Sequence, residues 1–453
     1  MKRIVGIVLL CALGYGLMAQ TQRIEHKVRW MENIFIIAKK YKTDPQTILD
    51  YNRITADEVK RGVVLYIPIV EEETRDPEVT NRDAWIDVAT PFNPNDCLHY
   101  RPYPGITHLV SLILPFNLNE ELPNSQFLEF YQGFLLAAEE LKEEGLGVRL
   151  SVYDQASYPN IYTLVQSGVF RNEELIIGPV YAQDIFELLR SMAETNVSIV
   201  SPLDPKTEQA VETHPHFFQV YPSLYWQQHN LLQYIEVGQG PVCLFYESGG
   251  GEEELLSTTR QLLMQRNIPY REFSYKVAKD QDITGQLARL LLPYANNQVV
   301  VASSNEPFVS DLLRNLHLMQ TMRQCPVTLF GNARWRNFEN IDLNHYHRMN
   351  LHLSVPNYVD YEELNVKYFL SRYRALFRTE PSAYAYQGYD VGHYFLRALY
   401  TKGPSFDHCV ESIYAQPLQS NFRFQKTNPY GGFTNTDTRI IRYLPDYRVE
   451  RVH

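Results

Sequence analysis

From Thr107 onward, strand-like and helix-like segments alternate along the chain, and this alternation restricts the possible folds more than any other feature. The segment THLVSLILPF is almost continuously apolar, which is typical of a strand buried on both faces of a parallel sheet. The next segment, FLEFYQGFLLAAEELKEEG, has apolar residues at helical spacing and ends at Gly145. Strands that alternate with helices predict a parallel sheet with right-handed crossovers.

The alternation occurs in two series, of which the first ends at FFQVYPS and the second begins at PVCLFYES. Two such series predict an α/β protein with two lobes. We expect lobe 1 to comprise about 107–221 and part of 357–403, and lobe 2 to comprise about 222–355 and the C-terminal segment. The expected crossings between the lobes are near Tyr221-Pro222, between Asn332 and Pro356, and after about Gly403.

The N-terminal segment MKRIVGIVLLCALGYGLMAQ has a basic start, an apolar stretch and a region of small residues. This pattern predicts a secretory signal peptide at 1–19 with cleavage after Ala19, and therefore a periplasmic protein. Leu10 stands before Cys11, where lipoprotein signals prefer a small residue, so we do not expect a lipoprotein. No other stretch reaches the length of about 18 apolar residues that a membrane span needs.

The net charge narrows the range of partners. The 453 residues include 42 Lys and Arg and 52 Asp and Glu, and removing the two basic residues of the signal leaves 40 − 52 = −12. An acidic protein without a long basic tract is a poor candidate for binding nucleic acid or an anionic membrane. We therefore expect no nucleic-acid partner.

The residues between the signal and the alternating region form two further segments. The unit 23–70 has the pattern strand, helix, helix, strand, carried by HKVRW, IFIIAKKY, PQTILDYN and VLYIP. The following stretch, 71–106, is first acidic and then rich in proline, which is typical of a linker. Four cysteines follow the signal, namely Cys97, Cys243, Cys325 and Cys409, and their spacing leaves open whether they pair or remain free thiols.

The strong enzyme signatures HExxH, GxSxG, Walker A and CxxC do not occur in the sequence, so we expect no enzymatic activity and no cofactor. A glycine-rich turn, YESGGGEEELL (246–256), resembles a phosphate loop, but its three consecutive glutamates would repel phosphate. His345, His347 and His352 lie close together without an acidic or cysteine ligand at suitable spacing, so packing is favoured over a metal site.

The ends of the predicted strands indicate where a ligand would bind. In open α/β sheets, ligands bind beyond the carboxyl ends of the strands. The polar and aromatic residues that follow the predicted strands converge there, and we expect them to line one cleft. These candidates are Tyr153, Asp154, Val180, Tyr181, Ser201, Asp204, Tyr246, Glu247, Ser303, Asn305 and Asn332.

The 23–70 unit resembles a LysM domain, a small βααβ module that binds N-acetylglucosamine glycans such as peptidoglycan. The matching residues are His26, Val28, Ile34, 37–41, Leu49, Asn52, Gly62, Leu65 and 67–68. The resemblance implies a glycan groove formed by Met31, Glu32, Asn33 and Ile34 on one side and Ile54, Thr55 and Ala56 on the other. Met31 stands where LysM sequences usually have a glycine.

Residues 107–453 resemble type I periplasmic binding proteins of the branched-chain amino-acid receptor kind. The resemblance is carried by ordered segments, namely LVSLILPF, the helix at 127–144, LIIGPVYAQD, SIVSPLD, FFQVYPS, VCLFYES, VVVASSN, LFGN and SAYAYQGYDVGHYFLRAL. It implies two Rossmann-like lobes that close over a ligand by hinge motion. The hydroxyl groups that hold the ligand's α-carboxylate in such receptors are missing from 179–182, and Asp204 would repel a carboxylate, so a free amino acid is not the expected ligand.

Two functions of different classes follow. The first is an exported, cell-wall-associated protein in which the LysM unit docks on peptidoglycan and the two-lobed domain senses a ligand or binds an envelope protein, by analogy with outer-membrane activators of peptidoglycan synthases. The alternative is a solute-binding receptor of an ABC transporter for a small polar ligand such as an amino acid or a peptide. The expected partners are peptidoglycan or another N-acetylglucosamine glycan, an envelope protein, and a small molecule.

Overall fold

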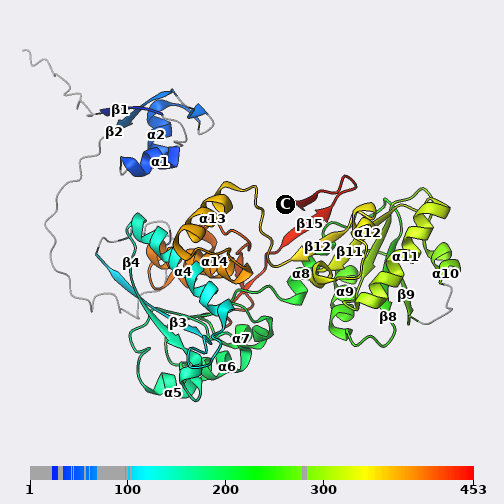
Figure 1. The fold of residues 1–453 in the computed structure, drawn as a ribbon, viewed down its shortest axis with the longest axis horizontal. Helices are drawn as coiled ribbons and strands as arrows, with labels where there is room; N and C mark the ends of the chain where they lie inside the picture. Colours follow the sequence, from blue (N-terminus) through cyan, green and yellow to red (C-terminus); the bar gives the residue numbers. More distant parts are fainter. Residues whose placement is uncertain are drawn as a thin grey trace, which may run out of the picture. The chain divides into compact units, whose positions relative to one another are not determined.

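The protein is described by a computed structural model that covers residues 23–28, 34–41, 43, 45–55, 58–60, 62–68, 97, 100, 102, 105–277 and 283–452. The chain divides into two compact units, Met1–Thr90 and Pro91–His453, and each unit is described by itself (Figure 1). The predicted signal peptide at 1–19 and most of the predicted linker at 71–106 lie outside the described residues.

The first unit has the order β1 (Arg23–Lys27), α1 (Ile34–Lys40), α2 (Pro45–Asn52) and β2 (Val64–Pro68). The two strands pair antiparallel, with His26 opposite Leu65. The side chain of Asn52 fastens the end of α2 to β2, because its Nδ2 donates to the Tyr66 carbonyl at 2.8 Å and its Oδ1 accepts from the Tyr66 N–H at 2.7 Å. Ile37 and Ile48 are fully buried between the helices and the strands. The strand–helix–helix–strand order predicted for this unit is therefore present.

In the second unit, lobe 1 contains a seven-stranded sheet with the order β13-β14-β7-β6-β5-β3-β4. Its strands are β3 (Thr107–Leu114), β4 (Gly147–Asp154), β5 (Leu175–Ile177), β6 (Ser198–Ser201), β7 (Phe217–Gln219), β13 (Phe424–Lys426) and β14 (Phe433–Asn435). Its helices are α4 (Ser125–Glu144), α5 (Ile161–Gln166), α6 (Ala182–Ser191), α7 (Glu208–Thr213), α13 (Leu364–Phe377) and α14 (Ala383–Lys402). The pairs among β3–β7 are parallel, as the alternation predicts.

Lobe 2 contains a second seven-stranded sheet with the order β16-β15-β12-β11-β10-β8-β9. Its strands are β8 (Val242–Glu247), β9 (Tyr270–Tyr275), β10 (Asn297–Val301), β11 (Val327–Asn332), β12 (His352–Val355), β15 (Arg439–Tyr443) and β16 (Val449–Val452). Its helices are α8 (Leu224–Leu232), α9 (Glu253–Gln265), α10 (Thr284–Leu290), α11 (Glu306–Arg323) and α12 (Leu343–Arg348). The strands β15 and β16 join antiparallel at one edge.

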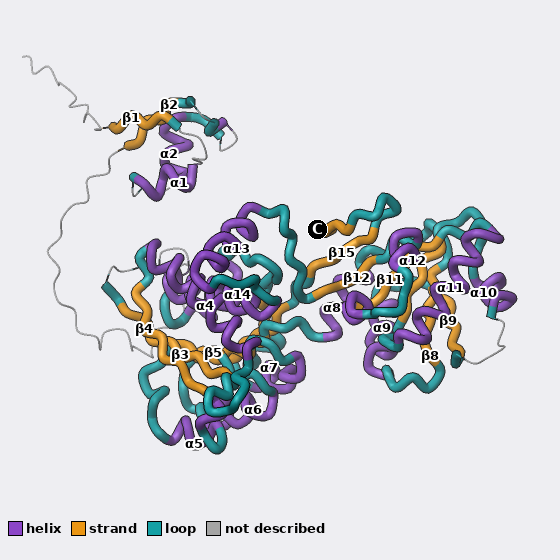
Figure 2. The backbone as a smooth tube through the Cα atoms, in the orientation of Figure 1, coloured by secondary structure: helices purple, strands orange, loops and turns teal. Residues whose placement is uncertain are grey.

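Helices cover both faces of each sheet, so each sheet has a hydrophobic core on either face (Figure 2). In lobe 1, Val110 and Leu112 of β3 pack against α4 and α14, whereas Ile113 of the same strand packs against α5 and α6 on the other face. A strand buried on both faces must be apolar along its whole length. This explains the continuous apolar run of THLVSLIL.

Helices α4 and α14 of lobe 1 approach each other unusually closely, and glycines make the approach possible. A Cβ atom on Gly133 of α4 would lie 1.8 Å from the carbonyl oxygen of Ala385, and one on Gly388 of α14 would lie 1.9 Å from the carbonyl oxygen of Phe130. Any side chain at these positions would push the two helices apart. Glycine therefore sets the distance between these helices.

Among the described residues, the chain passes between the two sheets three times. The first crossing lies between β7 and α8 at 220–223, the second between β12 and α13 at 356–363, and the third between β14 and β15 at 436–438. The third crossing is later than we expect from the sequence, since β13 and β14 still belong to the sheet of lobe 1. The segment after Gly403 therefore remains in lobe 1 as far as Asn435.

Two buried charged residues, Asp390 and Arg439, hold the loop 417–421 beside these crossings. Asp390 accepts hydrogen bonds from the backbone N–H groups of Leu418, Gln419 and Ser420. Arg439, the first residue of β15, donates to the carbonyl oxygens of Leu418 at 2.9 Å and Ser420 at 3.1 Å. Burial raises the pKa of Asp390 to about 6, although the three N–H donors and the positive charge of Arg439 oppose the rise.

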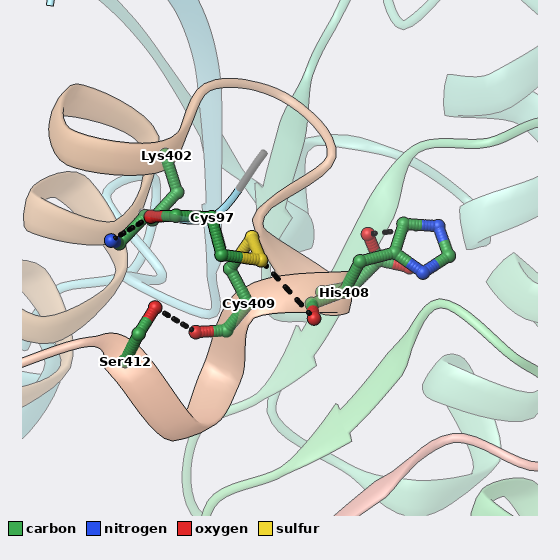
Figure 3. The surroundings of a disulfide bond; sticks show 6 residues. Cys97, Lys402, His408, Cys409 and Ser412 are labelled. Atoms are coloured by element: carbon green, nitrogen blue, oxygen red, sulfur yellow. Dashed lines mark hydrogen bonds and ion pairs between the residues drawn. A yellow bond between two sulfur atoms is a disulfide. The ribbon is translucent and has the colours of Figure 1, made fainter. Parts of the chain in front are cut away.

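A disulfide joins Cys97 to Cys409 of the 3₁₀ helix η6 (Phe406–Ser412), while Cys243 and Cys325 are buried free thiols. The carbonyl oxygen of Cys97 also accepts a hydrogen bond from Lys402 Nζ at 2.6 Å (Figure 3). Residue 97, which lies in the segment that we interpret as a linker, is thus fastened to lobe 1. Of the two possibilities that the sequence leaves open, pairing applies to two cysteines and burial to the other two.

Candidate ligand-binding site

A hollow of lobe 1 lies where the strands β5 and β6 end and has a volume of about 470 Å³. It is lined by aromatic, aliphatic and amide side chains together with a single carboxylate. The lining residues are Asn124, Gln126, Phe127, Val180, Tyr181, Leu203, Asp204, Pro205, Tyr221, Asn357, Ala383, Tyr384 and Gln387. Three predicted site residues, Val180, Tyr181 and Asp204, therefore come together here.

One wall of this hollow is the turn between β5 and α6. Tyr181 precedes the first turn of α6, and half of its surface is exposed. The carboxylate of Asp204 lies against this turn, because its Oδ2 accepts from the N–H of Ala182 at 2.8 Å while its Oδ1 accepts from the N–H of Lys206 at 2.8 Å. Asp204 thus caps α6 and the following 3₁₀ turn η4 (Pro205–Thr207) with one side chain.

The first turns of α4 and α14 also line the hollow. The rings of Phe127 and Tyr384 meet edge to face, with centroids 6.0 Å apart. Gln387 makes internal contacts, since its Nε2 donates to the Pro202 carbonyl and its Oε1 accepts from Gln419 Nε2. Burial raises the pKa of Tyr221, so its hydroxyl stays protonated at neutral pH.

Three other predicted residues of lobe 1 support the fold and do not line the hollow. Tyr153 packs edge to face on Phe170, with ring centroids 5.5 Å apart. Asp154 closes the loop after β3, because its carboxylate accepts from the N–H groups of Phe116, Asn117 and Leu118. Ser201 is fully buried.

The predicted residues of lobe 2 bond mainly to one another. Asn305 Nδ2 donates to Glu247 Oε2 at 2.7 Å, and Asn332 Nδ2 donates to the Ser303 carbonyl at 3.1 Å. The Ser303 hydroxyl oxygen accepts from the N–H of Asn305. At this edge of lobe 2, the polar groups of the predicted residues are therefore largely used in hydrogen bonds within the lobe.

Tyr246 and Glu247 also line a second hollow of about 170 Å³ beside the glycine-rich turn 249–251. Glu247, Glu252 and Glu253 surround it, together with Arg260. Arg260 is already paired with Glu272, at 2.6 Å between Nη2 and Oε2. The acidic lining fits the argument against a phosphate site, since it would repel an anion.

The histidines of 345–352 lie on two different elements. His345 and His347 belong to α12, and His352 begins β12. The imidazole of His345 lies beside that of His317 of α11, with ring centroids 5.3 Å apart. Within the described ranges, no group of three or more His, Cys, Asp or Glu side chains is placed to hold a metal ion.

The predicted glycan groove of the first unit is described only in part. Met31, Glu32, Asn33 and Ala56 lie outside the described residues. Ile34 is buried in the core of the unit, and Ile54 packs against that core. The N–H and hydroxyl of Thr55 donate to Glu58 Oε2 at 2.8 and 3.1 Å.

Several residues that sequence reasoning misses in the lobe 1 hollow come from helix starts. Asn124, Gln126 and Phe127 belong to the start of α4, and Tyr384 and Gln387 belong to the start of α14. Leu203, Pro205 and Tyr221 follow strand ends, and Asn357 lies in the second crossing. The aromatic run SAYAYQGY, which contains Gly388, is the signal that could have pointed to α14.

Comparisons with known proteins identify the class of fold. No family model and no curated protein matches the sequence. Among solved structures, a branched-chain amino acid ABC transporter protein from Rhodospirillum rubrum is similar with a TM-score of 0.58 at 13% identity, covering 77% of this chain and 100% of that one. A branched-chain amino acid ABC transporter periplasmic ligand-binding protein from Burkholderia xenovorans is similar with a TM-score of 0.51 at 10% identity, covering 76% and 94%. Full-length LpoA from Haemophilus influenzae is similar with a TM-score of 0.51 at 10% identity, and this chain covers 60% of it.

These similarities and the two sheets agree on one class of fold. The unit Pro91–His453 has the two-lobed α/β fold of the type I periplasmic binding proteins, as we predict from the sequence. No helix in the described part of the chain is long and apolar enough to cross a membrane.

Proposed function

We propose that this protein is an exported, non-enzymatic binding protein that holds a small polar ligand in the lobe 1 hollow. The observation that carries this proposal is the hollow itself, which lies at the carboxyl ends of parallel strands and combines an apolar lining with a few polar groups. Its volume of about 470 Å³ falls in the range of about 300–1,000 Å³ that is common for small-molecule sites.

The comparisons support a solute receptor over a purely structural role. Two proteins with the same fold are described as belonging to ABC transporters, and one of them is described as ligand-binding. Hinge closure around a ligand needs flexible crossings between the lobes. The three crossings at 220–223, 356–363 and 436–438 provide such positions.

A second candidate function concerns the first unit. We propose that the βααβ unit is a LysM domain that docks the protein on peptidoglycan or another N-acetylglucosamine glycan. Its separate core and the antiparallel pairing of β1 with β2 support this proposal. In that case the two-lobed unit works at the cell wall, where an envelope protein partner could also bind it.

A thermal-shift screen of the mature chain tests the solute receptor. The panel contains amino acids, peptides, muropeptides and sugars, and a ligand at one hundred times its Kd stabilises the folded state by about 2.7 kcal/mol. A Tyr181→Ala variant, which alters the hollow at a half-exposed side chain, should lose the shift. The absence of any shift across the panel would contradict the proposal.

Retention on purified sacculi tests the docking function. We expect the full mature chain to sediment with sacculi and a chain that begins at Pro91 to stay in solution. Equal retention of both chains, or retention of neither, would contradict glycan docking by the first unit.

A further inference from the structure

We infer that the ligand of the lobe 1 hollow is an uncharged saccharide, held between aromatic rings and side-chain amides. This inference rests on the proposed function of the hollow as a ligand site, and it specifies the chemical class of the ligand. Three features of the lining lead to it: none of the described lining residues is a cation, a carboxylate of the chain occupies the start of α6, and aromatic rings lie together with side-chain amides.

The charge of the lining disfavours anionic ligands. Among the described residues that line the hollow, Asp204 alone is charged. Both of its oxygens accept backbone N–H groups, from Ala182 and Lys206. The fold therefore uses both oxygens of this carboxylate, although each keeps a further lone pair, and a carboxylate ligand finds no cation among the described lining residues.

The first turn of α6 shows why an acidic ligand is disfavoured. The N–H groups at a helix start attract an anion. Here the chain itself provides that anion, because Asp204 Oδ2 lies 2.8 Å from the Ala182 nitrogen. An incoming carboxylate would have to displace Asp204 or lie beside it.

The cation Arg334 lies near the hollow but does not line it. Its charge lowers the pKa of Tyr221 and so opposes the effect of burial, which raises that pKa.

The remaining lining suits a ring that bears hydroxyl or acetamido groups. Phe127, Tyr384, Tyr181 and Tyr221 offer aromatic surfaces, against which the C–H faces of a sugar ring can pack. The amides of Asn124, Gln126 and Asn357 supply both donors and acceptors, which matches hydroxyl groups that also do both. A purely aliphatic ligand would leave these amides without partners.

Calorimetric titration of the mature chain tests this inference. The probes are cellobiose and the β-1,4-linked disaccharide of N-acetylglucosamine, with leucine and glutamate as charged comparisons. The variant is Tyr384→Ala, and the matched control is Tyr430→Ala, which removes an exposed tyrosine of lobe 1 that is outside the hollow. We expect at least one disaccharide to bind, and Tyr384→Ala to weaken that binding tenfold or more while Tyr430→Ala changes it less than twofold.

The possible results separate the inference from the proposed function. Binding of a disaccharide that Tyr384→Ala leaves unchanged would place that binding outside the hollow, as in the first unit, and would overturn the inference. Binding of leucine or glutamate that Tyr384→Ala abolishes would overturn the saccharide class but keep the hollow as a ligand site. The absence of binding by all four probes would overturn the inference, and the broader screen would then decide the proposed function.

Discussion

The crossing of α4 and α14 gives a prediction in which two opposing effects can be weighed. Replacing Gly388 by Ala removes a glycine from the interior of a helix, which by itself stabilises a protein by about 1 kcal/mol. The added Cβ, however, would lie 1.9 Å from the Phe130 carbonyl oxygen and 2.7 Å from its carbon. Ordinary contacts need about 3.4 Å or more, and backbone atoms cannot yield without moving α4.

Overpacking of this kind costs about 1–3 kcal/mol, and more where backbone must shift. Because the clash involves backbone on both sides, we expect the cost to exceed the gain in helix propensity. Gly388→Ala should therefore lower the free energy of unfolding by about 2 kcal/mol. Since α4 and α14 both contribute their first turns to the hollow, ligand binding should weaken as well.

Urea unfolding followed by circular dichroism measures this effect. The matched control is Gly285→Ala in α10, where a built Cβ meets nothing within 4 Å. The control should unfold at the same or a higher urea concentration than the unmodified chain. If Gly388→Ala is as stable as the Gly285→Ala control, the close crossing described here is wrong.

Three further predictions concern the disulfide and the crossings. Reduction of Cys97–Cys409 should lower the free energy of unfolding by about 2–5 kcal/mol, and a reductant should have no effect on a chain in which both cysteines are Ala; an equal response of both chains would contradict the pairing. Burial raises the pKa of Asp390 from 3.8 to about 6, so the folded state holds the proton of this carboxyl more tightly than the unfolded state does. The resulting stabilisation of about 3 kcal/mol is fully present below about pH 4 and is lost as the pH rises through 6. Relative to Asp390→Asn, which cannot titrate, the unmodified chain should thus lose stability between pH 4 and 7 in urea unfolding, and a pH-independent difference would refute this. Arg439→Met should lower the free energy of unfolding by about 3–5 kcal/mol, because the buried charge of Asp390 loses the nearby positive charge and the carbonyl groups of Leu418 and Ser420 lose their donor. A melting temperature equal to that of the unmodified chain would contradict this role of Arg439.

Sequence periodicity predicts the parallel part of both sheets because each buried strand is apolar along its length. It does not predict that the strands β13 and β14, which are three residues long and contain Gln425, Lys426 and Thr434, belong to the sheet of lobe 1. These strands pair with the edge of the lobe 1 sheet through the stacked rings of Phe433 and Phe218, a contact between residues more than two hundred positions apart. Local patterns carry no information about such pairing, so the third crossing is expected too early.

The candidate site is predicted in part, for a related reason. The strand-end rule finds Val180, Tyr181 and Asp204, because the carboxyl ends of parallel strands meet at one edge. It cannot say which polar side chains the fold itself uses, so Asp154 and Asn332, which bond to loops and neighbouring strands, are selected equally. Helix α14 lines the hollow because Gly388 lets it pack closely against α4. Such packing between helices that are distant in the sequence cannot be predicted from local patterns.

The central claim is that the lobe 1 hollow binds an uncharged saccharide, and hydrogen exchange of the mature chain tests it most directly. The exchange is measured with and without a saturating amount of the β-1,4-linked disaccharide of N-acetylglucosamine, and again with cellobiose. We predict that at least one of them slows exchange in 180–186, 203–207 and 383–389, around the hollow, and leaves 247–254 beside the acidic hollow of lobe 2 unchanged. Protection confined to lobe 2 or to the first unit, or no protection with either sugar, would contradict the claim.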